Sequence, residues 1–120
     1  MGQLTFSTSI HKIQFHKLLE EDNTYPSDTE RFALFYIIAG NGDLYRKRSY
    51  IYDFKTHGIK QCLQNEGVDF SSGMKSLIRL GFNLYNGYED NFSSPASLFY
   101  NLDEDNRIIA MNAISIRFIL

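Results

Sequence analysis

The chain has 120 residues and a formal net charge of −2, and 15% of its residues are aromatic. This length suits a single domain, residues 1–120, with one core, and the aromatic content excludes a disordered chain. The slightly negative charge supplies no field that would hold the chain to nucleic acid or to an anionic membrane. Cys62 is the only cysteine, which excludes an intramolecular disulfide and a cysteine-based metal site.

The N-terminal stretch MGQLTFSTSIHK lacks a basic segment followed by an apolar core. No apolar run in the sequence reaches the roughly 18 residues that a membrane span needs. A lone cysteine agrees with a reducing compartment. We therefore expect a cytoplasmic protein with no membrane partner.

The first predicted element is an amphipathic helix over Ser9–Glu21. Its apolar residues recur at helical spacing, and one of the hydroxyl residues Ser7, Thr8 or Ser9 can cap its first turn. The apolar stripe comprises Ile10, Ile13, Phe15, Leu18 and Leu19.

The second predicted helix, Ser27–Ala39, is apolar over its last eight residues. Ser27 or Asp28 can cap it, and Glu30 lies in the first turn, where an acidic residue favours the positive end of the helix dipole. Gly40 can close the helix by taking the left-handed conformation. Because this helix has almost no polar face, we expect it at the centre of the fold.

Residues 44–70 carry a weaker signal. Just before them, Asn41-Gly42-Asp43 is expected to begin a short helix or a turn. The letters SYIYDF then favour a strand, KTHG is typical of a turn, and IKQCLQNEG is compatible with one helical turn and its exit. We predict an irregular segment here, and the pattern leaves open whether it holds a short hairpin.

The strongest helical periodicity follows, in a helix that opens at Ser71 or Ser72 and carries apolar residues at helical spacing as far as Tyr88. Gly81 lies inside this helix and permits close contact with another one. After it, SSPASLFYNL predicts a short helix that Pro95 begins.

The last predicted helix runs from about residue 106 to residue 118, with Asp103 or Asp105 as its cap. Its tail, AISIRFIL, also alternates like a strand. Taken together, the elements predict a mostly or all α fold, a compact single-domain bundle of five or six helices.

No known catalytic motif occurs in the sequence. There is no P-loop and no G-x-S-x-G motif, and GNGD matches only the first three positions of the dinucleotide-binding fingerprint. His11 and His16 stand five residues apart, whereas zinc-binding helices use spacings of three or four. We expect these two histidines and His57 to be solvated or half-buried, and we predict no catalytic residue, no cofactor and no metal ligand.

One basic run offers a candidate binding surface. Arg46, Lys47 and Arg48 lie between Tyr45 and Tyr50, a combination that can grip a phosphate or stack a base. A solvated turn beside aromatic anchors is the simpler interpretation, because the chain as a whole is acidic. The alternative function that this run supports is a nucleic-acid-associated accessory factor.

A second alternative rests on acidic residues. Asp53-Phe54-Lys55 resembles the D-x-K half of some metal-dependent nuclease sites, although no partner acid stands at a spacing that nominates it. Asp43, Asp53 and His57 would be the residues of such a metal-dependent hydrolase.

Arg31 and Arg79 are embedded among large apolar residues, and an inward-facing guanidinium needs a carboxylate or carbonyl partner. Asp28, Asp43 and Asp53 are the candidate acids. We expect at least one arginine to bond an acid or the carbonyls of the GNGD turn and so to tie helix to loop, while a polar hot spot on a binding face is the alternative. The candidate binding residues are Arg31, Asn41, Asp43, Tyr45, Arg46, Arg48, Asp53 and Arg79.

Four phrases follow one another in the sequence: YPSDTERFALFYIIAGNGDLYRKRSYIYDF, SLIRLGFNLYNGY, LFYNLDEDN and NAISIRF, within a resemblance that spans about His11 to Phe118. The most specific parts are LFYIIAGN, DLY, YDF and FNLYN. Together they resemble a small domain-of-unknown-function family carried by Gram-positive bacteria, their prophages and mobile elements. The resemblance implies no activity and no catalytic residue. It implies a genomic setting in which small acidic proteins often bind a host or defence protein.

We therefore expect a non-enzymatic protein–protein interaction module. One form of it is a phage- or mobile-element-encoded inhibitor or modulator of a bacterial host or defence protein. A homodimer joined by exposed aromatic residues is one expected arrangement. The nucleic-acid-associated factor and the metal-dependent hydrolase remain the alternatives.

Overall fold

The structure, a computed structural model, describes residues 4–64 and 67–120, which form six α-helices and one two-stranded hairpin. The helices are α1 (Ser9–Asp22), α2 (Thr29–Gly40), α3 (Gly42–Arg46), α4 (Ser72–Asn86), α5 (Pro95–Tyr100) and α6 (Glu104–Phe118). The strands are β1 (Tyr52–Asp53) and β2 (Gly58–Ile59), and the 3-10 turns are η1 (Arg48–Tyr50) and η2 (Cys62–Gln64). The prediction of a mostly α bundle of five or six helices is confirmed. No helix in the described part of the chain is long and apolar enough to cross a membrane.

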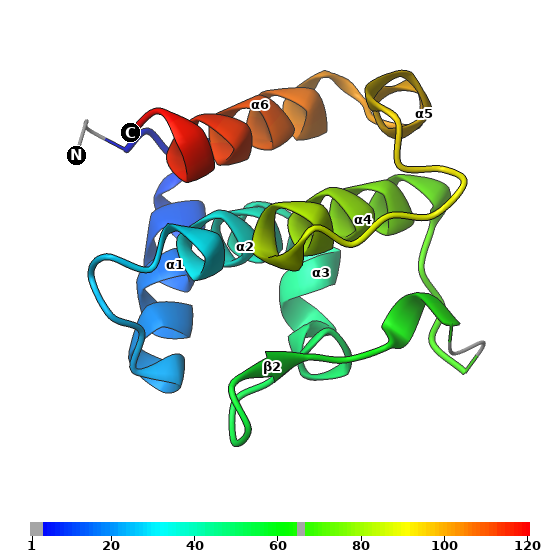
Figure 1. Cartoon of the computed structure of the whole chain (residues 1–120). Coiled ribbons are helices and arrows are strands. Elements are labelled where there is room, and N and C mark those ends of the chain that lie inside the picture. Colours follow the sequence, from blue (N-terminus) through cyan, green and yellow to red (C-terminus); the bar gives the residue numbers. More distant parts are fainter. Residues whose placement is uncertain (1–3, 65–66) are drawn as a thin grey trace.

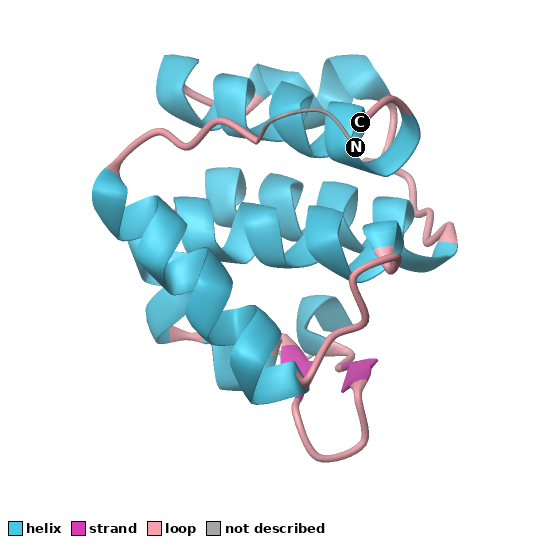
Figure 2. Ribbon diagram, turned by 90° about the vertical axis from the view of Figure 1, so that its left-hand side faces the viewer, coloured by secondary structure: helices cyan, strands magenta, loops and turns pink. Residues whose placement is uncertain are grey.

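Helix α2 occupies the centre of the bundle, as its apolar sequence predicted. All eight residues from Phe32 to Ala39 are buried, and α1, α4 and α6 pack around them. Figure 1 shows α6 above α2 and α4, with α3 and the hairpin below, and Figure 2 shows the same layers from the side. The core therefore forms on several sides of one helix.

Side-chain caps fix the first residue of each long helix. Thr8 caps α1, Asp28 caps α2, and Ser71 caps α4, each by accepting a hydrogen bond from a backbone N–H three residues ahead. Asp103 rather than Asp105 caps the last helix. For that reason α6 begins at Glu104, two residues earlier than the predicted start at 106.

The expected role of Gly40 is wrong. Gly40 is the last residue of α2, and the next residue, Asn41, has an extended backbone with φ of −126°. Among the described glycines only Gly87, which closes α4, has a positive φ. A Cβ atom on Gly40 would lie 2.8 Å from Cδ1 of Ile109 and 3.1 Å from the His11 ring. Gly40 therefore serves close packing of α1 and α6 on α2, and not helix termination.

The close contact predicted at Gly81 is confirmed. A Cβ atom at this position would lie 2.9 Å from Cδ1 of Leu34, a fully buried residue of α2. The absence of a side chain at Gly81 thus lets α4 approach the central helix.

The segment 44–70 does hold a short hairpin. Strands β1 and β2 are antiparallel, with Tyr52 opposite Ile59. Asp53 holds the connecting turn, because its Oδ1 accepts the backbone N–H groups of Lys55 and Thr56. The helical turn expected in IKQCLQNEG is η2, and residues 65–66 of that stretch lie outside the described residues.

His11 is buried, so the expectation of a solvated or half-buried imidazole is wrong for it. Its Nε2–H donates to the backbone carbonyl of Tyr36 at 2.9 Å, and its Nδ1 accepts the backbone N–H of Ser7 at 3.2 Å. Burial lowers the pKa of His11, and the bond to the Tyr36 carbonyl offsets only part of that effect. The neutral ring is therefore a structural link between α1 and α2.

We expect this link to make the fold sensitive to mild acid. Because the pKa of His11 in the folded chain lies below 6.5, the unfolded chain takes up that proton first as the pH falls. The contribution of His11 to the free energy of unfolding is complete above pH 6.5 and decreases below it. Chemical denaturation between pH 7 and pH 5 measures this, with His11→Gln as the control that keeps a donor but does not titrate. An imidazole NMR titration that places His11 at or above 6.5 contradicts the prediction.

Candidate functional site

Arg31, in the first turn of α2, binds three other segments of the chain. Its Nη1 donates to Asp28 at 2.8 Å, and its Nη2 donates to the His57 carbonyl at 2.6 Å and to the Tyr85 hydroxyl at 3.1 Å. Its Nε donates to the Tyr52 hydroxyl at 2.9 Å. The expectation that at least one embedded arginine bonds an acid is confirmed. One guanidinium thus joins the α1–α2 loop, the hairpin and α4.

Asp22 is the acidic centre of the same cluster and is only 3% exposed. Its carboxylate accepts hydrogen bonds from Thr24 and Tyr52, both at 2.6 Å, and contacts Nδ1 of His57 at 2.8 Å. Arg31 Nε lies 3.7 Å away. Burial raises the pKa of Asp22, but the three hydrogen bonds outweigh burial, and the pKa lies below its usual value. Sequence reasoning missed Asp22, because an acid that follows two glutamates at a helix end resembles a solvated one.

His57 is held in an unusual conformation. Its φ is 60°, in the left-handed region that non-glycine residues seldom adopt, which costs of order 1 kcal/mol. Asp22 holds its ring and Arg31 holds its carbonyl, so the cluster compensates for this strain. The Thr24 hydroxyl donates to Asp22 and not to His57. Among the described residues, no Ser, Thr or Cys side chain is hydrogen-bonded to the His57 ring. These contacts fit a structural junction better than a catalytic one.

We name this group the Asp22–Arg31 cluster: Asp22, Asp28, Arg31, Tyr52, His57 and Tyr85. A pocket of about 490 Å³ opens beside it. The pocket is lined by Asp22, Asn23, Thr24, Tyr25, Pro26, Asp28, Arg31 and His57.

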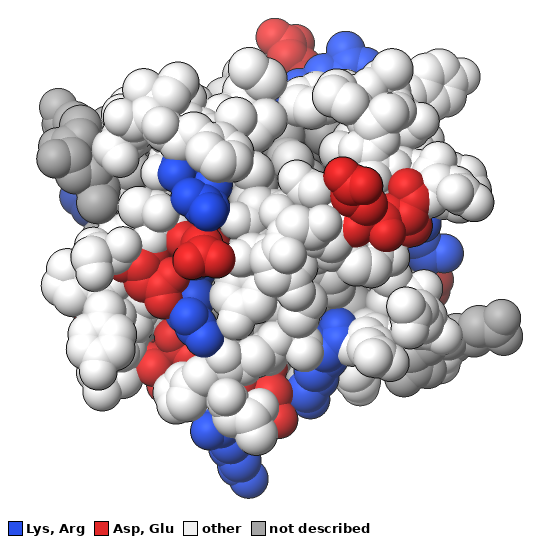
Figure 3. Space-filling model, viewed as in Figure 1, with Lys and Arg blue, Asp and Glu red and all other residues white. Residues whose placement is uncertain are grey.

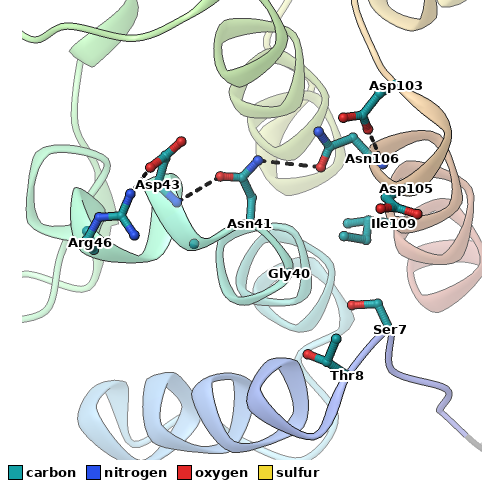
Figure 4. Close-up of a pocket in the computed structure, with 11 residues that line it drawn as sticks. Ser7, Thr8, Gly40, Asn41, Asp43, Arg46, Asp103, Asp105, Asn106 and Ile109 are labelled. Carbon is teal, nitrogen blue, oxygen red and sulfur yellow. Dashed lines mark hydrogen bonds and ion pairs between the residues drawn. The ribbon is translucent and has the colours of Figure 1, made fainter.

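A second pocket, of about 450 Å³, brings together three of the predicted binding residues, Asn41, Asp43 and Arg46. Figure 4 shows residues of α2, α3 and α6 around it, together with Ser7 and Thr8 just before α1, and the Asn41 side chain is bonded to Asn106 at 3.4 Å. Asp103 and Asp105 add two further acids.

The N-termini of three helices meet at this pocket, and each of them has a side-chain cap. Thr8, Asn41 and Asp103 each accept backbone N–H groups of the helix that they precede. The GNGD turn is therefore part of a junction of three capped helices.

The side chains of the basic run each have a partner within the protein. Arg46 pairs with Asp43, one turn earlier in α3. Lys47 donates to the Asp69 carbonyl. Arg48 donates to the Tyr45 carbonyl at 2.9 Å and lies over the Tyr45 ring at 4.4 Å. These contacts correspond to the simpler interpretation of the run, a solvated turn beside an aromatic anchor.

The residues of the hydrolase alternative have separate roles. Asp43 pairs with Arg46, Asp53 holds the hairpin turn, and His57 faces Asp22. Within residues 4–64 and 67–120, no three His, Cys, Asp or Glu side chains are placed to hold a metal ion. The sequence suggested Asp28, Asp43 and Asp53 as partners for the embedded arginines. Arg31 uses Asp28, whereas Asp43 and Asp53 pair with neither Arg31 nor Arg79.

Arg79 uses an acid that the sequence did not suggest. Its Nε donates to Asp90 at 2.9 Å, and its guanidinium lies 5.0 Å from the centre of the Phe92 ring. Burial raises the pKa of Asp90, but the bonds from Arg79 and its other donors outweigh burial and lower it to about 2. Asp90 lies in the loop between α4 and α5, so this bond also ties a helix to a loop.

The fold and these clusters define a small helical domain whose polar side chains join its elements to one another. The chain belongs to DUF6075, a family of unknown function whose model matches residues 1–119. This confirms the resemblance to an uncharacterised domain family. No curated protein and no solved structure matches the chain.

We predict that Arg31 is essential for stability. Truncation in Arg31→Ala removes the guanidinium that pairs with Asp28 and Asp22 and that holds the hairpin and α4, at a cost of about 3 kcal/mol, the lower end for a broken buried pair. The melting temperature should fall by roughly 10 °C. The control is Arg46→Ala, whose exposed pair with Asp43 contributes at most about 1 kcal/mol. Equal melting of the two variants, measured by calorimetry, contradicts a structural role for Arg31.

A second prediction concerns the effect of acidic pH on the free energy of unfolding. Because the pKa of Asp22 in the folded chain lies below 3.8, its contribution to stability is complete above that pH and is lost as the pH falls through the folded value. Asp22→Asn should make the free energy of unfolding less dependent on pH below about 4. Thr24→Val, which removes one of the bonds that lower this pKa, should give an intermediate slope. Parallel slopes for Asp22→Asn and the parent would show that Asp22 is not the titrating group.

Proposed function

We infer that the binding surface of this protein lies on helix α6, which has an apolar face on each of its two sides. The face toward the core consists of Ile109, Ala110, Ala113 and Ile116. On the opposite side Ile108, Met111 and Phe118 are 51%, 55% and 67% exposed. Ser115 falls between the last two, and the spacings of three, four and three residues place the four side chains on one line. We call these four residues the outer face of α6.

This outer face is not needed for the domain's own core. Figure 1 shows α6 at the top of the bundle, and α2 and α4 pack on the side that carries its buried residues. Single exposed apolar residues are ordinary on protein surfaces, whereas a contiguous group of them marks an interaction site. A helix with apolar residues at alternating spacings of three and four typically docks into a groove or against another helix.

We propose that this protein is a non-enzymatic interaction module that binds a partner protein along the outer face of α6. The observation that carries the proposal is the line of exposed apolar side chains on that helix. The expected genomic setting, a phage or mobile element, suggests which kind of partner the module binds. We propose a bacterial host or defence protein that the module inhibits or modulates in the cytoplasm. A second copy of the chain is the other occupant that such a helix face accepts.

Charge supports a protein partner over nucleic acid. On the face that Figure 3 shows, Lys and Arg side chains lie among Asp and Glu side chains and form no extended basic patch. The basic run, residues 46–48, is engaged in contacts within the chain. A nucleic-acid-binding surface needs several free cations on one face.

The test is a charge placed on the outer face. We expect Met111→Glu to weaken capture of the bacterial partner at least about 30-fold, because a charge at the centre of an apolar contact removes a hot spot. Quantitative affinity capture from bacterial lysate, followed by mass spectrometry, measures the loss, and sedimentation of the purified chain tests for the second copy.

The matched control is Ile13→Glu, which makes a similar change at an exposed position of α1. Both variants should melt close to the parent, since both side chains are exposed. If the Met111→Glu and Ile13→Glu variants capture the partner equally well, and if both sediment like the parent, then α6 is not the binding surface.

A further inference from the structure

A pocket of about 370 Å³ lies between α4, α5 and the loop that joins them. It is lined by Arg79, Phe92, Ala96, Ser97, Tyr100 and Asn101. Its volume falls within the range of small-molecule sites and is enough for one amino-acid residue of a ligand. The pocket is distinct from the Asp22–Arg31 cluster and from the GNGD turn.

Arg79 brings unused hydrogen-bonding capacity to this pocket. An arginine has five N–H donors. Arg31 uses four bonds within its cluster, whereas Arg79 makes one hydrogen bond to the described part of the chain, from Nε to Asp90. Its two Nη groups are the planar fork that binds a carboxylate through two parallel bonds. The Arg79 side chain is nevertheless only 16% exposed, so it is held in place.

Asp90 positions this arginine without occupying its fork. Oδ2 of Asp90 accepts from Arg79 Nε and from the Tyr88 hydroxyl, and Oδ1 accepts from the Phe92 N–H and the Ser93 hydroxyl. Its four acceptor positions are therefore filled. Arg79 is thus fixed by its Nε edge while its Nη groups have no partner among the described residues.

Two aromatic rings border the pocket and are unusually exposed. Phe92 is 60% exposed and Tyr100 is 85% exposed. An apolar or aromatic group of a ligand could pack on these rings while an acidic group meets Arg79.

We propose that this pocket binds a carboxylate that stands next to an apolar or aromatic residue in the partner protein. The Arg79 fork holds the carboxylate, and Phe92 and Tyr100 pack on its neighbour. The inference rests on the proposed function for the source of the ligand, an acidic segment or a chain terminus of that partner. The Nη donors of Arg79, which have no partner among the described residues, and the mixed polar and aromatic lining select this chemistry over a purely apolar ligand.

Small probes test the pocket without the partner. N-acetylphenylalanine presents a terminal carboxylate beside a ring, and N-acetyl-aspartyl-phenylalanine amide presents a side-chain carboxylate. We expect at least one to bind with a Kd of about 1 mM, in line with a ligand of this size. N-acetylphenylalanine amide, which lacks the charge, should bind about tenfold more weakly. Two-dimensional NMR should locate the shifts at the Arg79 Nε–H and at residues 96, 97 and 101.

Variants separate the two parts of the pocket. Arg79→Lys keeps the charge but loses the fork and should weaken binding about tenfold. Tyr100→Ser should weaken it about threefold with an unchanged melting temperature, because this side chain is exposed. The matched control, Tyr25→Ser, removes an exposed tyrosine away from the pocket and should bind like the parent.

The inference is overturned if neither acid binds at these residues, if the amide binds as tightly as the acids, or if Tyr100→Ser and Tyr25→Ser have equal affinities. The tighter of the two acids identifies the source of the carboxylate. Failure here is distinct from failure of the proposed function. If neither probe binds but Met111→Glu still loses the partner, the α6 surface stands and only the pocket is removed.

Discussion

Helix α2 is buried along eight consecutive residues, Phe32 to Ala39, and so has no side that can face water. Each large apolar side chain that is fully buried contributes roughly 1.5–3 kcal/mol relative to an exposed one. The gain is available only if other helices cover α2 on several sides, as α1, α4 and α6 do. Gly40 and Gly81 stand where these neighbours come closest, since a Cβ atom at either position would meet a buried side chain at less than 3 Å.

The positive charge of Arg31 on α2 explains why the hairpin packs against the start of this helix. Arg31 lies in the first turn of the helix, at the positive end of the dipole, where a cation is unfavourable. Asp28 and Asp22 offset this by placing carboxylates beside the guanidinium. The remaining donors then reach the His57 carbonyl and Tyr52, which lie on the hairpin. A two-residue ladder is weak by itself, and this cluster supplies the contacts that hold it to the bundle.

The sequence predicted what depends on neighbours in the chain and missed what depends on distant ones. Helix periods, the caps and the central place of α2 follow from residues within a few turns of one another. The burial of His11 depends on a carbonyl 25 positions away, and the buried carboxylate of Asp22 contacts a hydroxyl 30 positions away and a ring 35 positions away. Of the candidate site, Asn41, Asp43 and Arg46 come together because they are adjacent in sequence. The other candidates are dispersed over separate contacts.

The surface of α6 that we propose as a binding site lies in a segment whose sequence pattern is ambiguous. The tail AISIRFIL alternates like a strand because apolar residues face both sides of the helix, with Ile116 in the core and Phe118 in solvent. A helix that only closed the core would carry one apolar stripe. The second stripe adds nothing to the described core and carries a risk of non-specific association. The second apolar stripe, which made the secondary structure of this segment ambiguous in the sequence, is therefore also the main reason to propose a binding role for it.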